Sequence, residues 1–329
     1  MRDLYKKIDS LITKLNFDEI WKGFTPCDFA LYNKETVFLK NEEIPPDERY
    51  MGNTAKIIDG KPIAIWHVSD APKVDPETLA SKVVHEMFHG FQMSQGDTRW
   101  ADEFKLFAYP RDLDNYELKL AENHYLAKAM EENCQTSFEQ FSTIRRARKR
   151  LIGDFIIEEF KTETLEGTAT YVELMALKQI SHEKFVDAVE KHIKIIRNPE
   201  KLFNIRDISY SVGAMLCIAL KVMGINFHHE LTETRTLFEL IELKPNIVET
   251  KFETFQSELQ KRFDDFHKSH SNKVSVKKQI TGFDPMNMVR LGDEILCEHF
   301  VCLDDLIIDG KVLLIMEKNS FYDVVSYLN

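Results

Sequence analysis

Apolar residues recur at helical spacing through most of the chain and alternate near its two ends. Residues 3–16 read as a helix, with Leu4, Ile8 and Leu11 on one side. From residue 75 to about residue 268 the spacing is mainly helical. Helices are expected near residues 115–133, 138–160, 163–180, 182–195, 208–223 and 246–268. The pattern therefore predicts a mainly helical α+β protein.

Short alternating runs predict β-structure at both ends. Residues 27–40 alternate and break at Asn33-Lys34, as in a short hairpin. Asp59-Gly60 separates two β-rich runs, and such a pair adopts the positive φ angles of a tight hairpin turn. A polar stretch over residues 268–278 precedes β-rich runs at residues 294–297 and 312–316.

These patterns divide the chain into three consecutive parts. We expect an N-terminal helix and small sheet over residues 1–70, and a helical body over residues 71–268. A β-rich C-terminal segment should follow over residues 269–329. The last part either forms its own small domain or completes a sheet of the body.

Length and charge narrow the classes of function. A chain of 329 residues buries a sizeable core without disulfides or a structural metal, so a metal site here is expected to be catalytic. Its 43 basic and 54 acidic residues give a net charge of −11, which repels phosphate backbones and argues against a nucleic-acid partner. The basic cluster Arg145 to Arg150 is interpreted as the solvated face of a helix.

Cysteine usage and the N-terminus predict a cytoplasmic location. The five cysteines include no Cys-x-x-Cys pair, which is typical of a reducing compartment, and Cys217 lies in an apolar run as a core thiol. The chain opens with an amphipathic helix and not with an apolar signal core. No apolar run reaches the ~18 residues of a membrane span, so no membrane partner is expected.

The central helical region contains the motif His-Glu-x-x-His, with His85, Glu86 and His89. Residues four apart on a helix lie only ~40° apart around its axis, so both imidazoles can converge on one ion. Neutral imidazoles suit zinc. Glu86 is offset by ~100°, which places it beside the metal, where it can take a proton from a water molecule. The flanking residues are apolar, so this helix should be buried, with Asp75 and Pro76 at its start.

A catalytic zinc usually has a third protein ligand, and Glu166 is the best candidate. It opens the segment Glu-Gly-x-Ala-x-Tyr-x-Glu, in which the small Gly167 and Ala169 would let this helix approach the His helix closely. Glu173, two turns later, is expected to orient a ligating imidazole. The alternative for Glu166 is a solvated acid in the first turn of a helix. Glu103 and Glu122 compete as ligands but lack small neighbours.

These residues resemble the gluzincin zinc peptidases, and the Glu166 segment is similar to the third-ligand segment of aminopeptidase N-like members. The resemblance implies a zincin-like catalytic core over about residues 50–225. It implies one zinc ion per chain, with His85, His89 and Glu166 as ligands and Glu86 as the general base. Two departures stand out. Seventy-seven positions separate His89 from Glu166, more than in those enzymes, and no Gly-x-Met-Glu-Asn segment is present, so aminopeptidase specificity is not implied.

The resemblance also suggests a catalytic tyrosine and a strand that binds substrate. Tyr210 lies in a Tyr-x-x-Gly pattern at an expected helix start and would stabilise the oxyanion. The alternative is that Tyr210 is a half-buried aromatic, in which case Tyr171 is the next candidate. Residues 63–66 are the expected edge strand that pairs with an extended peptide.

The predicted function is zinc-dependent hydrolysis of a peptide or small amide. One alternative is a non-peptidase amidase or esterase that uses the same site, since the motif defines the metal and the base but not the substrate. The other is a catalytically silent protein that binds peptides or has a regulatory role. The intact Glu86 argues against the second alternative, because binding alone does not need a general base. These motifs do not define an oligomeric state.

Overall fold

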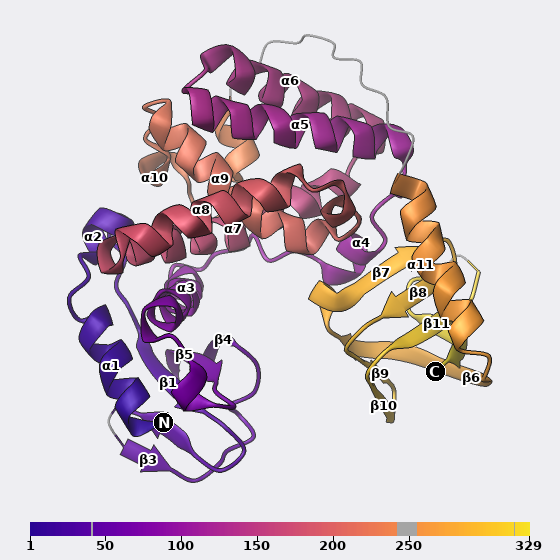
Figure 1. Cartoon of the computed structure of the whole chain (residues 1–329), viewed down its shortest axis with the longest axis horizontal. Coiled ribbons are helices and arrows are strands. Elements are labelled where there is room, and N and C mark those ends of the chain that lie inside the picture. Colours follow the sequence, from indigo (N-terminus) through magenta and orange to yellow (C-terminus); the bar gives the residue numbers. More distant parts are fainter. Residues whose placement is uncertain (41, 242–254, 319) are drawn as a thin grey trace. The chain divides into compact units, whose positions relative to one another are not determined.

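The computed structural model describes residues 1–40, 42–241, 255–318 and 320–329 (Figure 1). The expected α+β class is confirmed, with two separate sheets among the helices. Two compact units are interleaved along the chain. Unit 1 comprises residues 1–100, 163–194 and 211–241, and unit 2 comprises residues 101–162, 195–210 and the described part of 242–329. This division differs from the three consecutive parts that the sequence suggested.

Unit 1 contains a five-stranded sheet with the order β3-β2-β1-β5-β4. Its strands are β1 (Asp28–Tyr32), β2 (Val37–Leu39), β3 (Glu42–Ile44), β4 (Thr54–Ile58) and β5 (Lys61–His67). Both predicted hairpins are present. Asp59 and Gly60 have φ angles of 50° and 77°, as the tight turn between β4 and β5 requires.

The prediction that residues 63–66 form an edge strand is wrong. They belong to β5, which pairs with β1 in parallel on one side and with β4 antiparallel on the other. Strands β1 and β5 are far apart in the sequence, so the local pattern of residues did not reveal that they pair. The edge strand on this side of the sheet is β4.

Helix α3 (Pro76–Ser94) packs against β4 and β5, and α1 (Arg2–Ile12) packs against α3 (Figure 1). The Asp75 side chain caps α3 by accepting a hydrogen bond from the Thr78 backbone N–H at 3.1 Å. Most of α3 from Leu79 to Gln92 is buried. The short helices α2 (Phe17–Ile20) and α10 (Phe227–Glu230) complete this unit.

Helix α7 (Phe155–Ile180) is one continuous helix where two were predicted. The break lies earlier, at Gly153, whose φ of 61° ends α6 (Gln135–Ile152). The chain between residues 160 and 163 contains no Gly or Pro, so the helix runs through it. Glu166 therefore lies in the middle of a helix and is only 7% exposed. This excludes the alternative of a solvated acid in a first turn.

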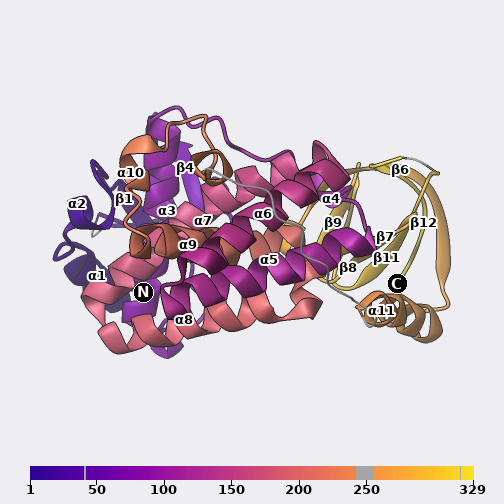
Figure 2. The same ribbon diagram turned by 90° about the horizontal axis from the view of Figure 1, so that it is seen from above.

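Helices α8 (His182–Arg197) and α9 (Ile205–Val222), like α7, run from one unit into the other. Unit 2 also contains α4 (Glu103–Phe107) and α5 (Leu113–Glu132), and α5 lies side by side with α6 (Figure 2). Of the helix expected over residues 246–268, residues 246–254 lie outside the described part. The remainder belongs to α11 (Phe255–Ser269).

The basic cluster of α6 is not a fully solvated face. Arg145 and Arg148 are completely buried, whereas Lys149 and Arg150 are exposed. The two arginines lie one turn apart and meet buried acids, with Arg145 Nε 3.0 Å from Glu122 Oε1 and Arg148 Nη2 2.6 Å from Glu159 Oε2. The prediction failed because these partner acids come from α5 and α7.

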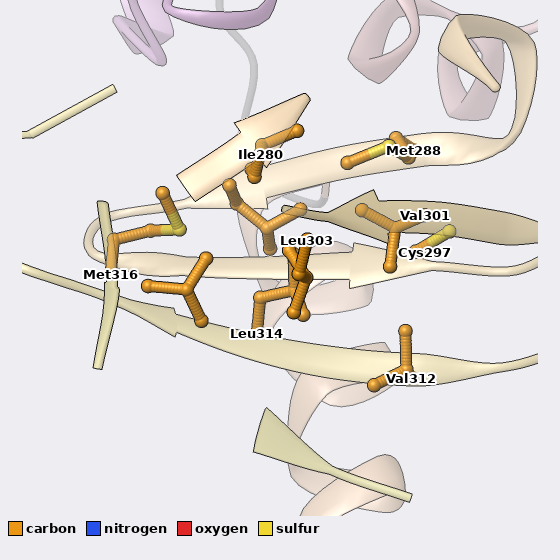
Figure 3. Close-up of a cluster of buried hydrophobic side chains, with 10 residues drawn as sticks. Ile280, Met288, Cys297, Val301, Leu303, Val312, Leu314 and Met316 are labelled. Carbon is orange, nitrogen blue, oxygen red and sulfur yellow. The ribbon is translucent and has the colours of Figure 1, made fainter. Parts of the chain in front are cut away.

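The C-terminal residues form their own seven-stranded antiparallel sheet, with the order β10-β9-β6-β12-β11-β8-β7. Its strands are β6 (Lys273–Phe283), β7 (Met288–Leu291), β8 (Glu294–Cys297), β9 (Phe300–Leu303), β10 (Leu306–Asp309), β11 (Val312–Met316) and β12 (Asp323–Leu328). Side chains such as Ile280, Leu303 and Leu314 form its buried core (Figure 3). The predicted runs became β8 and β11. Strand β6 was missed because part of it lies in the stretch read as polar.

None of the described helices combines the length and the apolar character that a membrane crossing needs.

Candidate metal centre

The structure brings the three predicted ligands together within unit 1. His85 and His89 come from adjacent turns of α3, and Glu166 comes from α7. His89 Nε2 lies 3.1 Å from His85 Nε2 and 3.0 Å from Glu166 Oε2, and His85 Nε2 lies 3.7 Å from the same carboxylate oxygen. All three side chains are buried, at 6–7% exposure.

This triangle of donor atoms has the dimensions of a zinc site. Zinc in proteins binds His nitrogen and carboxylate oxygen at ~2.0–2.2 Å, so two donors of a tetrahedral site lie roughly 3.3–3.5 Å apart. The observed separations of 3.0–3.7 Å bracket that range. Two nitrogens and one oxygen match the three protein donors that catalytic zinc sites usually have.

The charges around the triangle also favour a cation. Glu86 and Glu166 are buried beside the two histidines, and Glu173 Oε2 lies 3.3 Å from His85 Nδ1. Burial alone would lower the pKa of His85, but hydrogen bonds to Glu166 and Glu173 outweigh it and raise the pKa to about 10. Two imidazoles surrounded by three carboxylates therefore stabilise positive charge between them.

Glu86, the predicted general base, is buried near the two histidines. It follows His85 on α3 and is only 7% exposed. Burial raises the pKa of its carboxyl, and the attraction of His85 and His89 opposes this rise. A carboxylate of raised pKa beside a metal site can both accept and return a proton.

Glu173, which the sequence predicted to orient a ligating imidazole, lies beside the Nδ1 atom of His85, and that role stays a prediction. The corresponding partner of His89 was missed. It is Gln92, whose Oε1 lies 2.7 Å from His89 Nδ1. Gln92 follows His89 by three residues and lies between the apolar residues Phe91 and Met93. An amide at that spacing was the available signal, since residues three apart share a helix face.

Trp100 is a second residue that sequence reasoning missed. Its ring centroid lies 6.1 Å from that of His89, and the side chain is 44% exposed although it is large and apolar. Its apolar ring therefore lies beside His89, one of the candidate ligands. Nothing in its local sequence indicated this place, because the contact depends on the turn of the chain after α3.

Gly167 does not face the His helix as expected. A Cβ atom added there would lie 2.4 Å from the Cα of Gly213, so this glycine permits close contact between α7 and α9. Leu165 and Thr168 are the α7 residues that bind Gln92 of α3, through hydrogen bonds of 3.1 Å each.

The two candidate tyrosines lie in different surroundings. Tyr210 is half-buried in the second turn of α9, and not at a helix start, with Arg206 Cζ 5.5 Å from its ring centroid. It belongs to unit 2, whereas the three ligands belong to unit 1. Its role as an oxyanion donor therefore stays a prediction. Tyr171 is fully buried against Trp21 and Phe227.

The competing acids are matched by basic side chains. Glu103 Oε1 lies 3.2 Å from Arg206 Nε, and Glu122 bonds to Lys119, Arg145 and Arg148. Their charges are compensated within unit 2, and their ranking below Glu166 as ligands stays a prediction.

Comparison of the chain with protein-family models, with curated proteins and with solved structures gave no significant match.

Proposed function

We propose that this protein is a zinc-dependent hydrolase of amide bonds, with one zinc ion per chain held by His85, His89 and Glu166. The observation that carries the proposal is the convergence of Nε2, Nε2 and Oε2 within 3.0–3.7 Å of one another. The pair of histidines four residues apart supplies two donors from one helix face, and the buried Glu86 supplies the base that hydrolysis needs.

When bound, zinc would polarise the scissile carbonyl and lower the pKa of water. The protein residues supply the remaining chemistry. Glu86 accepts the proton of the attacking water and later delivers it to the leaving amine. Glu173 and Gln92 hold the two imidazoles in place through their Nδ1 atoms. Tyr210 is proposed as the donor to the oxyanion.

A peptide is the proposed substrate because an edge strand lies against the His helix. Strand β4 packs on α3 and pairs with β5, and no other described strand pairs with its second edge, where an extended chain could add. We accordingly assign the predicted strand role to β4. A mixed sheet with an edge strand next to the His helix also supports the proposal of a zincin-like core.

The function is tested by metal analysis together with a peptide-library digest. Zinc-loaded wild-type protein should contain one zinc ion per chain and cleave peptides. A chelator should remove the zinc and abolish cleavage, and added zinc should restore cleavage. Glu86→Gln should retain zinc and lose about 10²–10⁴ of the hydrolytic rate. Glu77→Gln, on the first turn of the same helix, is the matched control and should cleave normally.

The results separate the alternatives. Cleavage of an ester panel without cleavage of any peptide would point to an esterase on the same site. Zinc binding without hydrolysis of any substrate would point to a silent binding protein. Normal turnover by zinc-loaded Glu86→Gln would show that Glu86 is not the general base.

A further inference from the structure

Gln92 makes three side-chain hydrogen bonds beside the candidate metal centre. It lies on α3 one turn after His89 and is only 3% exposed. Its Oε1 lies 2.7 Å from His89 Nδ1, and its Nε2 lies 3.1 Å from both Leu165 O and Thr168 Oγ1. All contacts of this amide are therefore made inside unit 1, between the His helix and the helix that carries Glu166.

The chemistry of these partners fixes the orientation of the amide. Leu165 O is a backbone carbonyl and can only accept, so the amide group that faces it must be the NH₂. Thr168 Oγ1 donates its own proton to Leu165 O at 3.2 Å, which leaves its oxygen free to accept from Gln92. The carbonyl oxygen of Gln92 must then face His89.

The orientation of Gln92 determines which nitrogen of His89 carries hydrogen. An amide oxygen has no proton to donate, so His89 Nδ1 must donate to it. In a neutral imidazole the other nitrogen then carries a lone pair. That nitrogen, Nε2, faces His85 and Glu166 across the candidate metal position. A neutral imidazole with its lone pair directed this way is the form that binds metal.

We propose that Gln92 is a positioning residue that presents His89 to the metal in the required tautomer and orientation. The inference rests on the proposed function, because it concerns the same zinc site. The two imidazoles are held differently. Glu173 holds His85 with a carboxylate, whereas Gln92 holds His89 with a neutral amide whose other end is anchored to α7.

The test compares zinc dissociation constants measured by competition with a chromophoric chelator. Gln92→Met keeps the length of the side chain but has no acceptor for His89 Nδ1–H, and should weaken zinc binding about 10–100-fold. Gln92→Glu restores an acceptor oxygen for His89 Nδ1–H but loses the NH₂ donor to Leu165 O, so it should recover part of the lost affinity. Gln95→Met, at the exposed end of the same helix, should bind zinc like the wild type.

A second readout follows the proposed contact itself. In zinc-loaded wild-type protein the Nδ1 proton of His89 should give a hydrogen-bonded NMR resonance. Gln92→Met should shift that resonance and leave the His85 resonance in place, because Glu173 is unchanged. A purely structural role of Gln92 would lower thermal stability without this selective shift.

The outcomes separate the two proposals. If wild-type protein binds no zinc, both the function and this inference are wrong. If wild-type protein binds zinc and Gln92→Met binds it equally tightly, or leaves the His89 resonance unchanged, only the role of Gln92 is overturned. Equal weakening by Gln92→Met and Gln92→Glu would also overturn it, because the acceptor oxygen would then be irrelevant.

Discussion

Gly167 of α7 and Gly213 of α9 meet in direct backbone contact. A Cβ atom on Gly167 would lie 2.4 Å from Gly213 Cα, and a Cβ atom on Gly213 would lie 1.9 Å from the backbone oxygen of Glu163. The two helices can cross this closely only because both residues lack a side chain. Gly167 directly follows Glu166, so the crossing also determines where the third candidate ligand lies.

The first prediction concerns this crossing. Gly213→Ala should lower the free energy of unfolding by about 3 kcal/mol or more, because backbone atoms must move to admit the methyl group. It should also weaken zinc binding, since α7 carries Glu166. Gly282→Ala is the control, because its Cβ would make an ordinary 3.5 Å contact with Cys302. Chemical denaturation and zinc titration measure both effects. A Gly213→Ala protein as stable as the wild type would contradict the close contact between α7 and α9 at Gly167 and Gly213.

The second prediction ranks the acids near the metal centre by their effect on zinc affinity. Glu166→Ala removes a ligand and should cause the largest loss. Glu173→Gln weakens the hold on His85 and should cost about 10–100-fold. Glu183→Ala alters an exposed residue of α8 and should change nothing. Isothermal titration of each metal-free protein gives the ranking. Full zinc affinity in Glu166→Ala would show that the third ligand is another residue.

Local sequence signals predicted the parts of this molecule that neighbouring residues determine. The pair Asp59-Gly60 predicted the turn between β4 and β5, and Asp75-Pro76 predicted the start of α3. The four-residue spacing of His85 and His89 predicted that their imidazoles converge. Each feature depends on backbone preference or helix geometry within a few residues. The placement of Glu166 beside them was also predicted, although Gly167, one of the small residues used as the reason, faces α9 instead.

The features that were missed depend on partners distant in sequence. Gln92 binds residues more than seventy positions away, and Gly167 needs Gly213 as its neighbour. The local sequence predicts that Arg148 is exposed. It is buried because it forms an ion pair with Glu122 between α6 and α5. The edge position of β4 likewise follows from the parallel pairing of β1 with β5. Apart from the three-residue spacing of Gln92 from His89, these contacts leave no local pattern, because the tertiary fold sets them.

The third prediction tests Tyr210. If its hydroxyl stabilises the oxyanion, Tyr210→Phe should lower kcat by about 10²–10³ with little change in KM, because the donor acts mainly in the transition state. Tyr171→Phe is the control. It removes a buried hydroxyl that accepts from Lys221 Nζ at 3.3 Å, and should affect stability but not kcat. Steady-state kinetics on a peptide cleaved by the wild type decide the question. An unchanged kcat in Tyr210→Phe would identify Tyr210 as a packing residue.

The buried ion network of unit 2 leads to a prediction about pH. Lys119, Glu122, Arg148 and Glu159 are all completely buried, and Lys119 Nζ lies 2.6 Å from Glu159 Oε1 and 3.1 Å from Glu122 Oε1. Burial alone would raise the pKa of Glu122, but the attraction of Arg145, Arg148 and Lys119 outweighs it and lowers the pKa to about 2. The pKa of Glu159 is lowered for the same kind of reason.

A carboxylate whose pKa is lower in the folded state stabilises the fold above its unfolded pKa, near 4.5 for Glu122. That stabilisation is lost as the pH falls from about 4.5 towards 2. The contribution of Glu122 to the free energy of unfolding should therefore not change with pH near neutrality. The free energy of unfolding of the wild-type protein should fall steeply between about pH 4.5 and pH 2.

Lys119→Met provides the fourth prediction. The loss of a buried cation leaves Glu122 and Glu159 less well compensated, so their pKa values should rise and acid unfolding should begin at higher pH. The free energy of unfolding at pH 7 should also fall by about 3 kcal/mol, since removing one partner of a buried network is costly. Lys22→Met is the control, because Lys22 and its partner Asp18 are both more than half exposed. Urea unfolding measured from pH 7 down to pH 2 checks both effects. An acid transition at the wild-type pH in Lys119→Met would show that Lys119 does not hold these carboxylates in their charged form.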